Sequence, residues 1–246
     1  MCVKTLIQAH RGSTTRHPEN TLEAFSAAIK QGADGIELDV HLSKDGEIIV
    51  AHDARLERIS NGEGYINDYT LEELKSLDIG WFSLDRDAYR IPTLSEVFSL
   101  VKPSGLFVNV ELKTTERLHP DLPAKLLALA REYAMEERVI YSSFNHYSLK
   151  QIKALNPKAR IGLLYELGMV DPWVYAKYVG ADAIHPHYFV IAALPETVKR
   201  CHEHGIEVNV WTVDEPEAVK LMLKCAVDGI ITNKPDIALA CRDGSK

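Results

Sequence analysis

Two histidines, an arginine and two carboxylates lie close together near the start of the chain. They belong to the motifs His10-Arg11-Gly12, Glu37-Leu38-Asp39 and His52-Asp53, which fall within 44 residues. Imidazoles exchange protons near neutral pH, an arginine can hold an anion, and two carboxylates can provide half of a cation site. Cleavage of a phosphodiester requires these groups, and Glu111 and Lys113 complete the set farther along the chain.

Polar and apolar residues alternate in two segments that otherwise look like buried strands. Because successive side chains of a strand point to opposite faces, each segment has one polar face: Glu37, Asp39 and His41 in the first, and Asn109, Glu111 and Lys113 in the second. We expect the three carboxylates to converge on one cavity, where they would repel one another unless a cation or the lysine lies among them. A ligand set of oxygen atoms alone favours Mg²⁺ or Ca²⁺ over zinc.

The two histidines each end a strand-like segment, Leu6–His10 and Glu47–His52. We therefore expect both at the rim of the cavity, where imidazole groups beside carboxylates suit acid–base catalysis. Arg11 and Lys113 are predicted to hold an anionic phosphoryl group. Each of these four residues alone could equally be a structural residue or a salt-bridge partner, so the prediction depends on their combination.

Strand-like and helical segments alternate along the chain and predict the fold. The eight predicted strands are Thr5–His10, Gly35–Leu42, Leu106–Lys113, Val139–Phe144, Arg160–Glu166, Ala183–His187, Glu207–Val213 and Gly229–Thr232. The predicted helices are Thr21–Gln31, Leu94–Val101, Leu122–Tyr133, Tyr147–Leu155, Pro172–Val179, Pro195–His204, Glu215–Lys224 and Pro235–Cys241. Eight β/α units predict an α/β protein with a (β/α)8 TIM barrel. A doubly wound open sheet is the alternative.

Capping boxes are predicted at several helix starts. Asn20 with Glu23, Thr93 with Glu96, and Asp214 with Glu217 have the spacing of this motif.

One insertion interrupts the alternation after the second strand. Between Asp53 and Pro92 lie Gly62-Glu63-Gly64, a short helix predicted to begin at Thr70 with Glu73, and Gly80-Trp81-Phe82. A long insertion at the carboxyl end of a barrel strand usually forms a lid or a substrate wall, although a surface excursion without function is the alternative. We predict one catalytic domain, residues 1–246, with this insertion at about 53–92.

The composition narrows the class of protein. The 246 residues include 46% hydrophobic residues and carry a net charge of −7, which argues against a broad nucleic-acid-binding surface. The four cysteines show no metal-ligand spacing and are expected to be free thiols in a reducing compartment. No signal peptide and no apolar run long enough for a membrane span is visible, so we expect a cytoplasmic protein without stable membrane insertion. Its oligomeric state stays open, with a homo-oligomer possible.

The motifs taken together resemble the glycerophosphodiester phosphodiesterase family. The resemblance is carried by His10-Arg11-Gly12, Pro18-Glu19-Asn20-Thr21, Gly35-Ile36-Glu37-Leu38-Asp39-Val40, Lys44-Asp45-Gly46, His52-Asp53, Glu111-Leu112-Lys113 and Thr232-Asn233-Lys234-Pro235. It runs from the first strand to the last. It implies a (β/α)8 barrel of the phospholipase-C-like phosphodiesterase superfamily that hydrolyses glycerophosphodiesters, such as glycerophosphocholine or glycerophosphoethanolamine, to sn-glycerol 3-phosphate and an alcohol.

The resemblance also implies roles for individual residues. Glu37, Asp39 and Glu111 would bind one divalent metal ion, Ca²⁺ or Mg²⁺, and His10 and His52 would be the general base and the general acid. Four further residues, Phe144, His185, Trp211 and Asn233, stand at later strand ends. Trp211 matches an aromatic residue that packs against the glycerol carbons, and Phe144 is expected beside the substrate. The insertion would cover the glycerol side of the cleft.

Two other functions remain as alternatives. Lysophospholipase D and sphingomyelinase D-like enzymes have a similar site with two histidines and one metal but act on lipids, and an apolar surface near Trp81 and Phe82 would favour them. A barrel without catalytic activity could capture a phosphorylated ligand through Arg11 and Lys113, but it would have no need for both histidines and three carboxylates.

Overall fold

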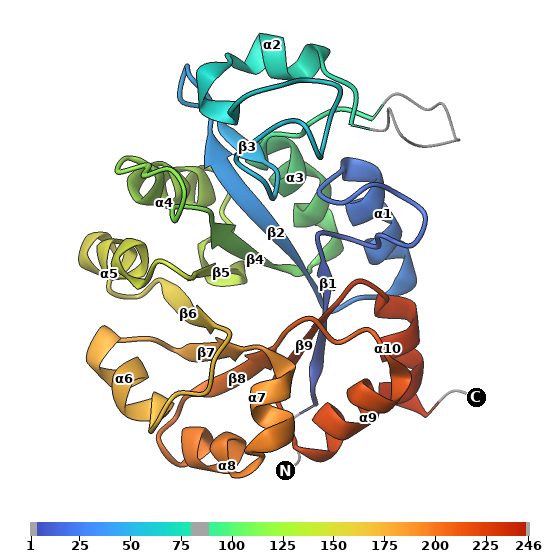
Figure 1. The fold of residues 1–246 in the computed structure, drawn as a ribbon, viewed down its shortest axis with the longest axis vertical. Helices are drawn as coiled ribbons and strands as arrows, with labels where there is room; N and C mark the ends of the chain where they lie inside the picture. The colour runs from blue at the N-terminus through green and yellow to red at the C-terminus, as the bar shows by residue number, and fades with distance from the viewer. Residues whose placement is uncertain (1–3, 80–88, 245–246) are drawn as a thin grey trace.

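Eight parallel strands close into a barrel in the computed structural model, which describes residues 4–79 and 89–244. Strand β1 (Leu6–His10) pairs with both β2 (Gly35–Leu42) and β9 (Gly229–Thr232), which closes the ring. The strands between them are β4 (Phe107–Leu112), β5 (Val139–Ser143), β6 (Arg160–Tyr165), β7 (Ala183–Pro186) and β8 (Glu207–Val210). The predicted (β/α)8 barrel is confirmed, and the alternative of an open sheet is wrong (Figure 1).

Helices surround the barrel on the outside (Figure 1). Eight of them match the predicted helices to within two residues at each end: α1 (Leu22–Gln31), α3 (Leu94–Val101), α4 (Leu122–Glu132), α5 (His146–Leu155), α6 (Pro172–Val179), α8 (Glu196–Glu203), α9 (Pro216–Lys224) and α10 (Pro235–Asp243). The short helix α7 (Tyr188–Ala193) and the 3₁₀ turns η2 (Lys102–Ser104) and η3 (Glu136–Arg138) were not predicted. Across residues 4–79 and 89–244, no helix is long and apolar enough to cross a membrane.

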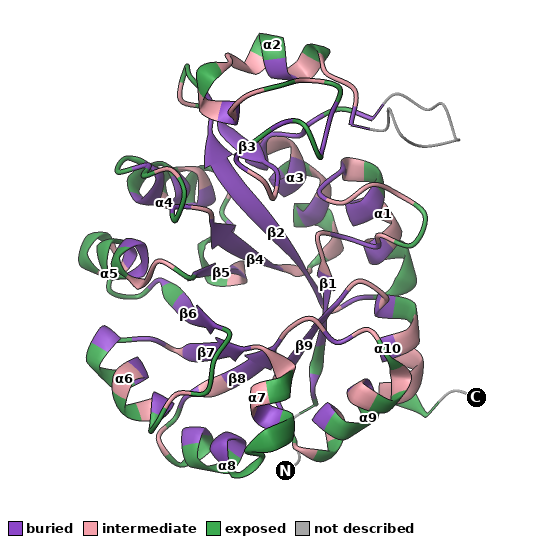
Figure 2. Ribbon diagram, viewed as in Figure 1, coloured by how far each residue is buried: buried purple, intermediate pink, exposed green. Residues whose placement is uncertain are grey.

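The main apolar core lies between the strands and the helices (Figure 2). On β2, Ile36, Leu38 and Val40 are fully buried on the face opposite Glu37 and Asp39, as the alternation of the sequence predicts. Burial of each such side chain stabilises the fold by about 1.5–3 kcal/mol. The burial of the apolar face against the helices therefore fixes the orientation of β2, and its polar face lines the barrel interior.

Two of the predicted capping boxes at helix starts are present and two are wrong. Thr93 and Thr70 each cap a helix, with the predicted glutamate in place. Thr21, and not Asn20, caps α1, because the side chain of Asn20 points to the carboxylate cluster instead. Asp214 caps no helix, because its carboxylate accepts hydrogen bonds from the Thr232 hydroxyl at the end of β9 and from the backbone amide of Asn233.

The insertion forms a small unit with its own apolar cluster. Strand β3 (Ile48–Val50) runs antiparallel to β2, and η1 (Ile66–Asp68) and α2 (Leu71–Ser76) follow. Their apolar side chains form a cluster separate from the main core: Ile49, Ala51, Leu56, Ile59, Ile66, Leu74, Ile79, Tyr89 and Ile91. This unit stands at one edge of the barrel (Figure 1). The Gly80-Trp81-Phe82 motif lies outside the described residues.

A layer of hydrogen-bonded polar side chains fills the barrel interior. The Asn109 amide donates to Gln8 Oε1 at 3.4 Å and accepts from Ser142 Oγ at 2.8 Å, and Asn209 Nδ2 donates to His185 Nε2 at 3.1 Å. His185 is therefore enclosed in the barrel and does not stand at a strand end that faces the solvent. Burial lowers the pKa of His185 to about 3, so its ring is neutral.

Candidate active site

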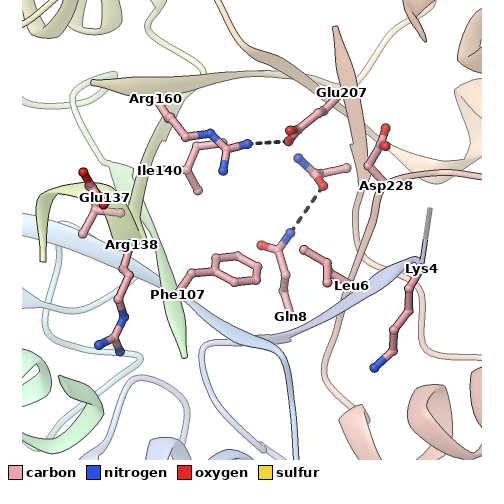
Figure 3. A pocket seen from close by; sticks show the side chains of 12 residues that line it. Lys4, Leu6, Gln8, Phe107, Glu137, Arg138, Ile140, Arg160, Glu207 and Asp228 are labelled. Atoms are coloured by element: carbon pink, nitrogen blue, oxygen red, sulfur yellow. Dashed lines mark hydrogen bonds and ion pairs between the residues drawn. The ribbon is translucent and has the colours of Figure 1, made fainter. Parts of the chain in front are cut away.

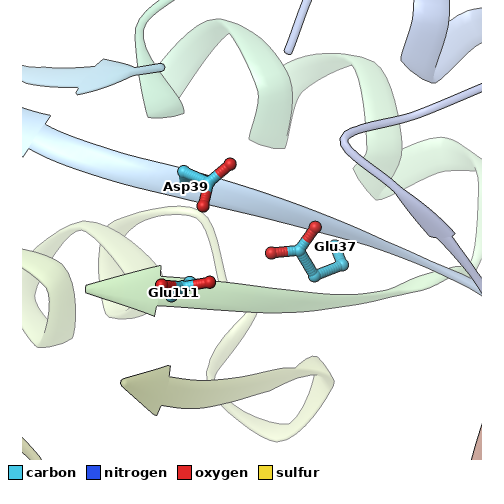
Figure 4. A group of neighbouring side chains, drawn as sticks. All are labelled: Glu37, Asp39 and Glu111. Atoms are coloured by element: carbon cyan, nitrogen blue, oxygen red, sulfur yellow. The ribbon is translucent and has the colours of Figure 1, made fainter. Parts of the chain in front are cut away.

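The strand register brings three carboxylates together at the carboxyl end of the barrel. Asp39 of β2 lies directly beside Glu111 of β4, and Glu37 precedes Asp39 on the same face. One oxygen from each of the three side chains lies within 4.8 Å of the others. Figure 4 shows the three groups pointing toward one another from two neighbouring strands. The predicted convergence of Glu37, Asp39 and Glu111 is thus present in the structure.

The three carboxyl groups have different pKa values because burial acts to raise all three, and neighbouring cations outweigh burial only at Asp39. Burial, with the charges of Asp39 and Glu111, raises the pKa of Glu37 well above its usual value. Burial and the charge of Asp39 raise the pKa of Glu111 to about 7. Burial alone would also raise the pKa of Asp39, but Lys113 and Arg11 hold that pKa below its usual value. A further cation would favour the ionised form of all three.

The donor set fits a hard divalent cation. All three candidate ligands are carboxylate oxygens, which Mg²⁺ and Ca²⁺ prefer. The Asp39 side chain is 1% exposed, and its Oδ1 atom accepts no hydrogen bond from any described residue. A buried carboxylate oxygen without a donor is costly. The residues present therefore suit a metal ion bound by Glu37, Asp39 and Glu111.

Two cationic side chains flank the carboxylates. Arg11 Nε lies 3.3 Å from Asp39 Oδ2, and Lys113 Nζ lies 2.8 Å from Glu111 Oε1 and 3.6 Å from Asp39 Oδ1. Arg11 and Gly12 have φ angles of 55° and 89°, so the chain turns sharply after β1. This turn lets the Arg11 amide donate to Glu37 Oε2 at 3.1 Å. Both cations are 17% exposed, which leaves them accessible to an anion in the cavity.

His10 is oriented by an amide from the opposite end of the chain. Its Nδ1 atom lies 2.8 Å from Asn233 Oδ1, and its Nε2 atom lies 3.9 Å from Glu37 Oε2. Because an amide oxygen only accepts, Nδ1 must donate, and Nε2 is left with a lone pair on the cavity side. Burial and the charge of Arg11 lower the pKa of His10 to about 4, so the ring is neutral at pH 7.

His52 belongs to the insertion and is joined to the barrel by a chain of ion pairs. Its Nδ1 atom lies 2.5 Å from Asp53 Oδ1, and Arg58 contacts Asp53 on the other side. Arg58 Nη2 then lies 2.7 Å from Glu19 Oε1, and Glu19 Oε2 lies 3.1 Å from Arg11 Nη1. Arg58 and His52 lower the pKa of Asp53 to about 2 against the effect of burial, so this partner of His52 is ionised.

A cavity of about 90 Å³ connects these groups. It is lined by both histidines, both cations, Glu37 and Glu111, and by two aromatic side chains, Phe144 and Trp211. The two rings meet edge to face with their centroids 5.5 Å apart, and Trp211 Nε1 donates to the His185 carbonyl. Phe144 and Trp211 therefore line the same cavity as the charged groups.

Three polar residues contact the site although the sequence predicted no role for them in it. Asn20 has a φ angle of 58° and donates from Nδ2 to Asp39 Oδ2 at 2.9 Å. Asn233, which the sequence placed only at a strand end, holds His10, and Asp214 in turn accepts from the Asn233 amide at 2.7 Å. Their partners lie far away in the sequence, so no local pattern indicates these contacts.

A second and larger cavity, of about 230 Å³, opens at the amino ends of the strands. Leu6, Phe107 and Ile140 provide an apolar lining, and Arg160 forms an ion pair with Glu207 at 2.6 Å (Figure 3). Among the described residues that line it there is no histidine, and the acidic cluster lies at the other end of the barrel. We therefore assign the chemistry to the smaller cavity, at the carboxyl ends, where catalytic residues of TIM barrels lie.

The chain is similar to known proteins in both its sequence and its fold. The model of the glycerophosphoryl diester phosphodiesterase family matches residues 10–237. The chain is 48% identical to a glycerophosphodiester phosphodiesterase of Caldanaerobacter subterraneus subsp. tengcongensis over 95% of this chain and 96% of that protein. It is similar to the crystal structure of a glycerophosphodiester phosphodiesterase from Agrobacterium tumefaciens, with 30% identity, a TM-score of 0.84 and coverage of 96% and 99%. It is also similar to an Oleispira antarctica phosphodiesterase solved with the product sn-glycerol-3-phosphate, with 27% identity, a TM-score of 0.89 and coverage of 97% and 96%.

Proposed function

Because the chain belongs to the glycerophosphoryl diester phosphodiesterase family and is an enzyme of that family, we propose that it hydrolyses glycerophosphodiesters with one divalent metal ion and two catalytic histidines. The substrates would include glycerophosphocholine and glycerophosphoethanolamine, and the products would be sn-glycerol 3-phosphate and an alcohol. The Oleispira antarctica structure with sn-glycerol-3-phosphate supports the product. The observation that carries the proposal is a cluster of three buried carboxylates, two of which line one cavity together with both histidines.

The charged residues would bind the phosphodiester. Glu37, Asp39 and Glu111 would hold Ca²⁺ or Mg²⁺, which supplies a Lewis acid for the phosphoryl oxygens. Arg11 and Lys113 would hold those oxygens as negative charge grows in the transition state. Both cations already face carboxylates, so they are positioned before the substrate binds.

The partners of the two histidines support different roles for them. Asn233 is a neutral acceptor for His10 Nδ1 and leaves the Nε2 lone pair free, which suits a general base that takes the proton of the nucleophile. Burial lowers the pKa of His52, but its anionic partner Asp53 acts in the opposite direction and stabilises the imidazolium form, which suits a general acid that protonates the departing alcohol. The nucleophile would be water or the substrate's own 2-hydroxyl, through a cyclic phosphate.

A coupled assay for released glycerol 3-phosphate tests the proposal. Protein stripped of metal is assayed on several diesters before and after the addition of Mg²⁺ or Ca²⁺. We expect no activity after stripping and recovery with at least one of these metals. Full activity after exhaustive chelation would show that the metal assignment is wrong.

The histidine roles are tested by His10→Ala and His52→Ala. Each is expected to lower turnover by at least ~10²-fold, the usual effect of losing a general acid or base. His202→Ala, which removes an exposed histidine of α8 outside the cavity, serves as the matched control. Normal turnover in either of the first two variants, with an intact fold, would contradict the assignment.

A further inference from the structure

One face of strand β2 lies beside the groups of the site in order. Glu37 pairs with His10 of β1, and Asp39 pairs with Glu111 of β4. His41 is the next residue on the same face, because alternate residues of a strand share a face. Two residues of a strand span about 6.6 Å, so His41 lies one such step beyond Asp39. The alternation in the sequence placed His41 on this face, and the proposed mechanism gives it no role.

The side chain of His41 donates a hydrogen bond to the backbone of His52. Its Nε2 atom lies 3.1 Å from the His52 carbonyl oxygen. Because a carbonyl oxygen only accepts, Nε2 must be the donor. His41 is 3% exposed, so little water competes for this bond. The bond therefore joins the strand that carries two of the three metal-binding carboxylates directly to the residue proposed as the general acid.

This hydrogen bond crosses the hairpin that joins the insertion to the barrel. Strand β2 runs past the end of β4 and pairs antiparallel with β3, where His41 lies opposite Ile49 (Figure 1). The Ala51 amide donates to the Asp39 carbonyl at 3.0 Å. The chain is thus bound to β2 one residue before His52 and again at the carbonyl of His52. These two bonds fix the distance of the His52 backbone from Asp39.

Packing holds the His41 ring in place from the side of β4. The ring of His119, a buried residue on the segment after β4, meets it edge to face with the two centroids 6.1 Å apart. The partners of the His52 ring belong instead to the insertion, where Asp53 and Arg58 contact its Nδ1 atom. Asp53 and Arg58 therefore orient the His52 ring, whereas His41 holds the backbone from which that ring extends.

We propose that His41 is a positioning residue for the general acid, and that its hydrogen bond to the His52 carbonyl places the His52 ring for proton transfer to the departing alcohol. This inference rests on the proposed function, in which His52 protonates that alcohol. A shift of about 1 Å in a catalytic group can cost ~10²-fold in rate. Loss of the His41 donor should therefore slow the step that needs the acid and leave the metal ligands in place.

The test compares a leaving group that needs an acid with one that does not. Choline must take up a proton as it leaves glycerophosphocholine, whereas p-nitrophenol leaves the p-nitrophenyl ester of glycerol 3-phosphate as a stable anion. His41→Leu keeps an apolar side chain of similar bulk but has no donor. We expect this variant to lower kcat about tenfold on glycerophosphocholine and less than about twofold on the nitrophenyl ester.

Two further variants of His41 and one control complete the test. The amide of His41→Gln can donate to the same carbonyl, so this variant should restore kcat on glycerophosphocholine to near the wild-type value. The side chain of His41→Asn is too short to reach, so this variant should behave like His41→Leu and replaces it if the leucine protein does not fold. His146→Leu removes the same kind of bond from a half-buried histidine, whose Nε2 lies 2.9 Å from the Leu164 carbonyl. It should leave the ratio of the two kcat values unchanged.

His52→Ala separates this inference from the proposed function. It lacks the acid itself and should also lose more rate on glycerophosphocholine than on the nitrophenyl ester. Equal losses on both esters in His52→Ala would contradict the proposed role of His52. If His52→Ala behaves as expected, equal losses on both esters in His41→Leu would overturn the positioning role, as would no loss on either. A His41→Gln protein as slow as His41→Leu would also overturn it. So would weaker calorimetric binding of Mg²⁺ or Ca²⁺ to His41→Leu, because the effect would then lie at the metal site.

Discussion

Glu111→Gln should stabilise the metal-free protein while it removes metal binding and activity. Burial and Asp39 raise the pKa of Glu111 from 4.5 to about 7. Between these two values the folded protein binds more protons than the unfolded chain, so the free energy of unfolding falls as the pH rises through this window. Each pKa unit corresponds to about 1.4 kcal/mol, so the ionised Glu111 destabilises the metal-free fold by roughly 3 kcal/mol above about pH 7.

Glutamine has the shape of the protonated glutamate but cannot ionise. The stability of Glu111→Gln should therefore equal that of the wild type below about pH 4.5 and exceed it by roughly 3 kcal/mol at about pH 8. Urea unfolding in the presence of a chelator, at both pH values, measures the difference. Glu116→Gln, at an exposed position on the segment after β4, is the matched control and is unfolded under the same conditions.

Glu111→Gln should lose activity as it gains stability, because the substitution removes a carboxylate charge that would bind the metal ion. Calorimetric titration with Mg²⁺ or Ca²⁺ should show weaker binding to Glu111→Gln. The reasoning is refuted if Glu111→Gln destabilises the metal-free protein by the same amount at both pH values. That result would mean that Glu111 acts mainly through its contact with Lys113.

Three further predictions concern residues that position the site. Asn20→Gly keeps the backbone free to adopt its φ of 58° but removes the hydrogen bond to Asp39, so calorimetry should show metal affinity reduced about 10- to 100-fold. Unchanged affinity would contradict this role. Asn233→Ala removes the partner of His10 and should lower kcat about tenfold, with KM little changed in steady-state kinetics. This loss is smaller than the ~10²-fold loss of rate expected when the general base itself is removed. A change confined to KM would argue against it. Thr93→Ala removes a capping box and should cost about 1 kcal/mol in urea unfolding while kcat stays the same.

The barrel could be predicted from the sequence because its signals are local. The alternation of Glu37 and Asp39 with Leu38 and Val40 indicates which face of the strand is buried under helices. In the structure, Leu38 and Val40 do pack into the main apolar core on that face. Helix α7 escaped prediction because Tyr188–Ala193 is a short apolar run without helical periodicity. Nothing in such a run distinguishes a helix from the continuation of a strand.

The candidate site was predictable in its charged groups and not in the residues that orient them. Carboxylates on one strand face can be recognised from their spacing. Asn20 has the sequence position of a helix cap, but its amide is used by a carboxylate 19 residues away. Asn233 contacts His10 across 223 residues. Contacts of this kind depend on the closure of the barrel, so only the fold shows them.

Because the insertion has its own apolar cluster, the two histidines lie on segments that pack against two different clusters. His10 is fixed in the barrel, whereas His52 lies on the segment between Ala51 and Leu56, whose side chains belong to the smaller cluster. A small unit of this kind can open locally at a lower free energy than the whole domain. The proposed general acid His52 would then move away from the general base His10 while the barrel stays folded. Heat should therefore inactivate the protein below the temperature at which its barrel melts.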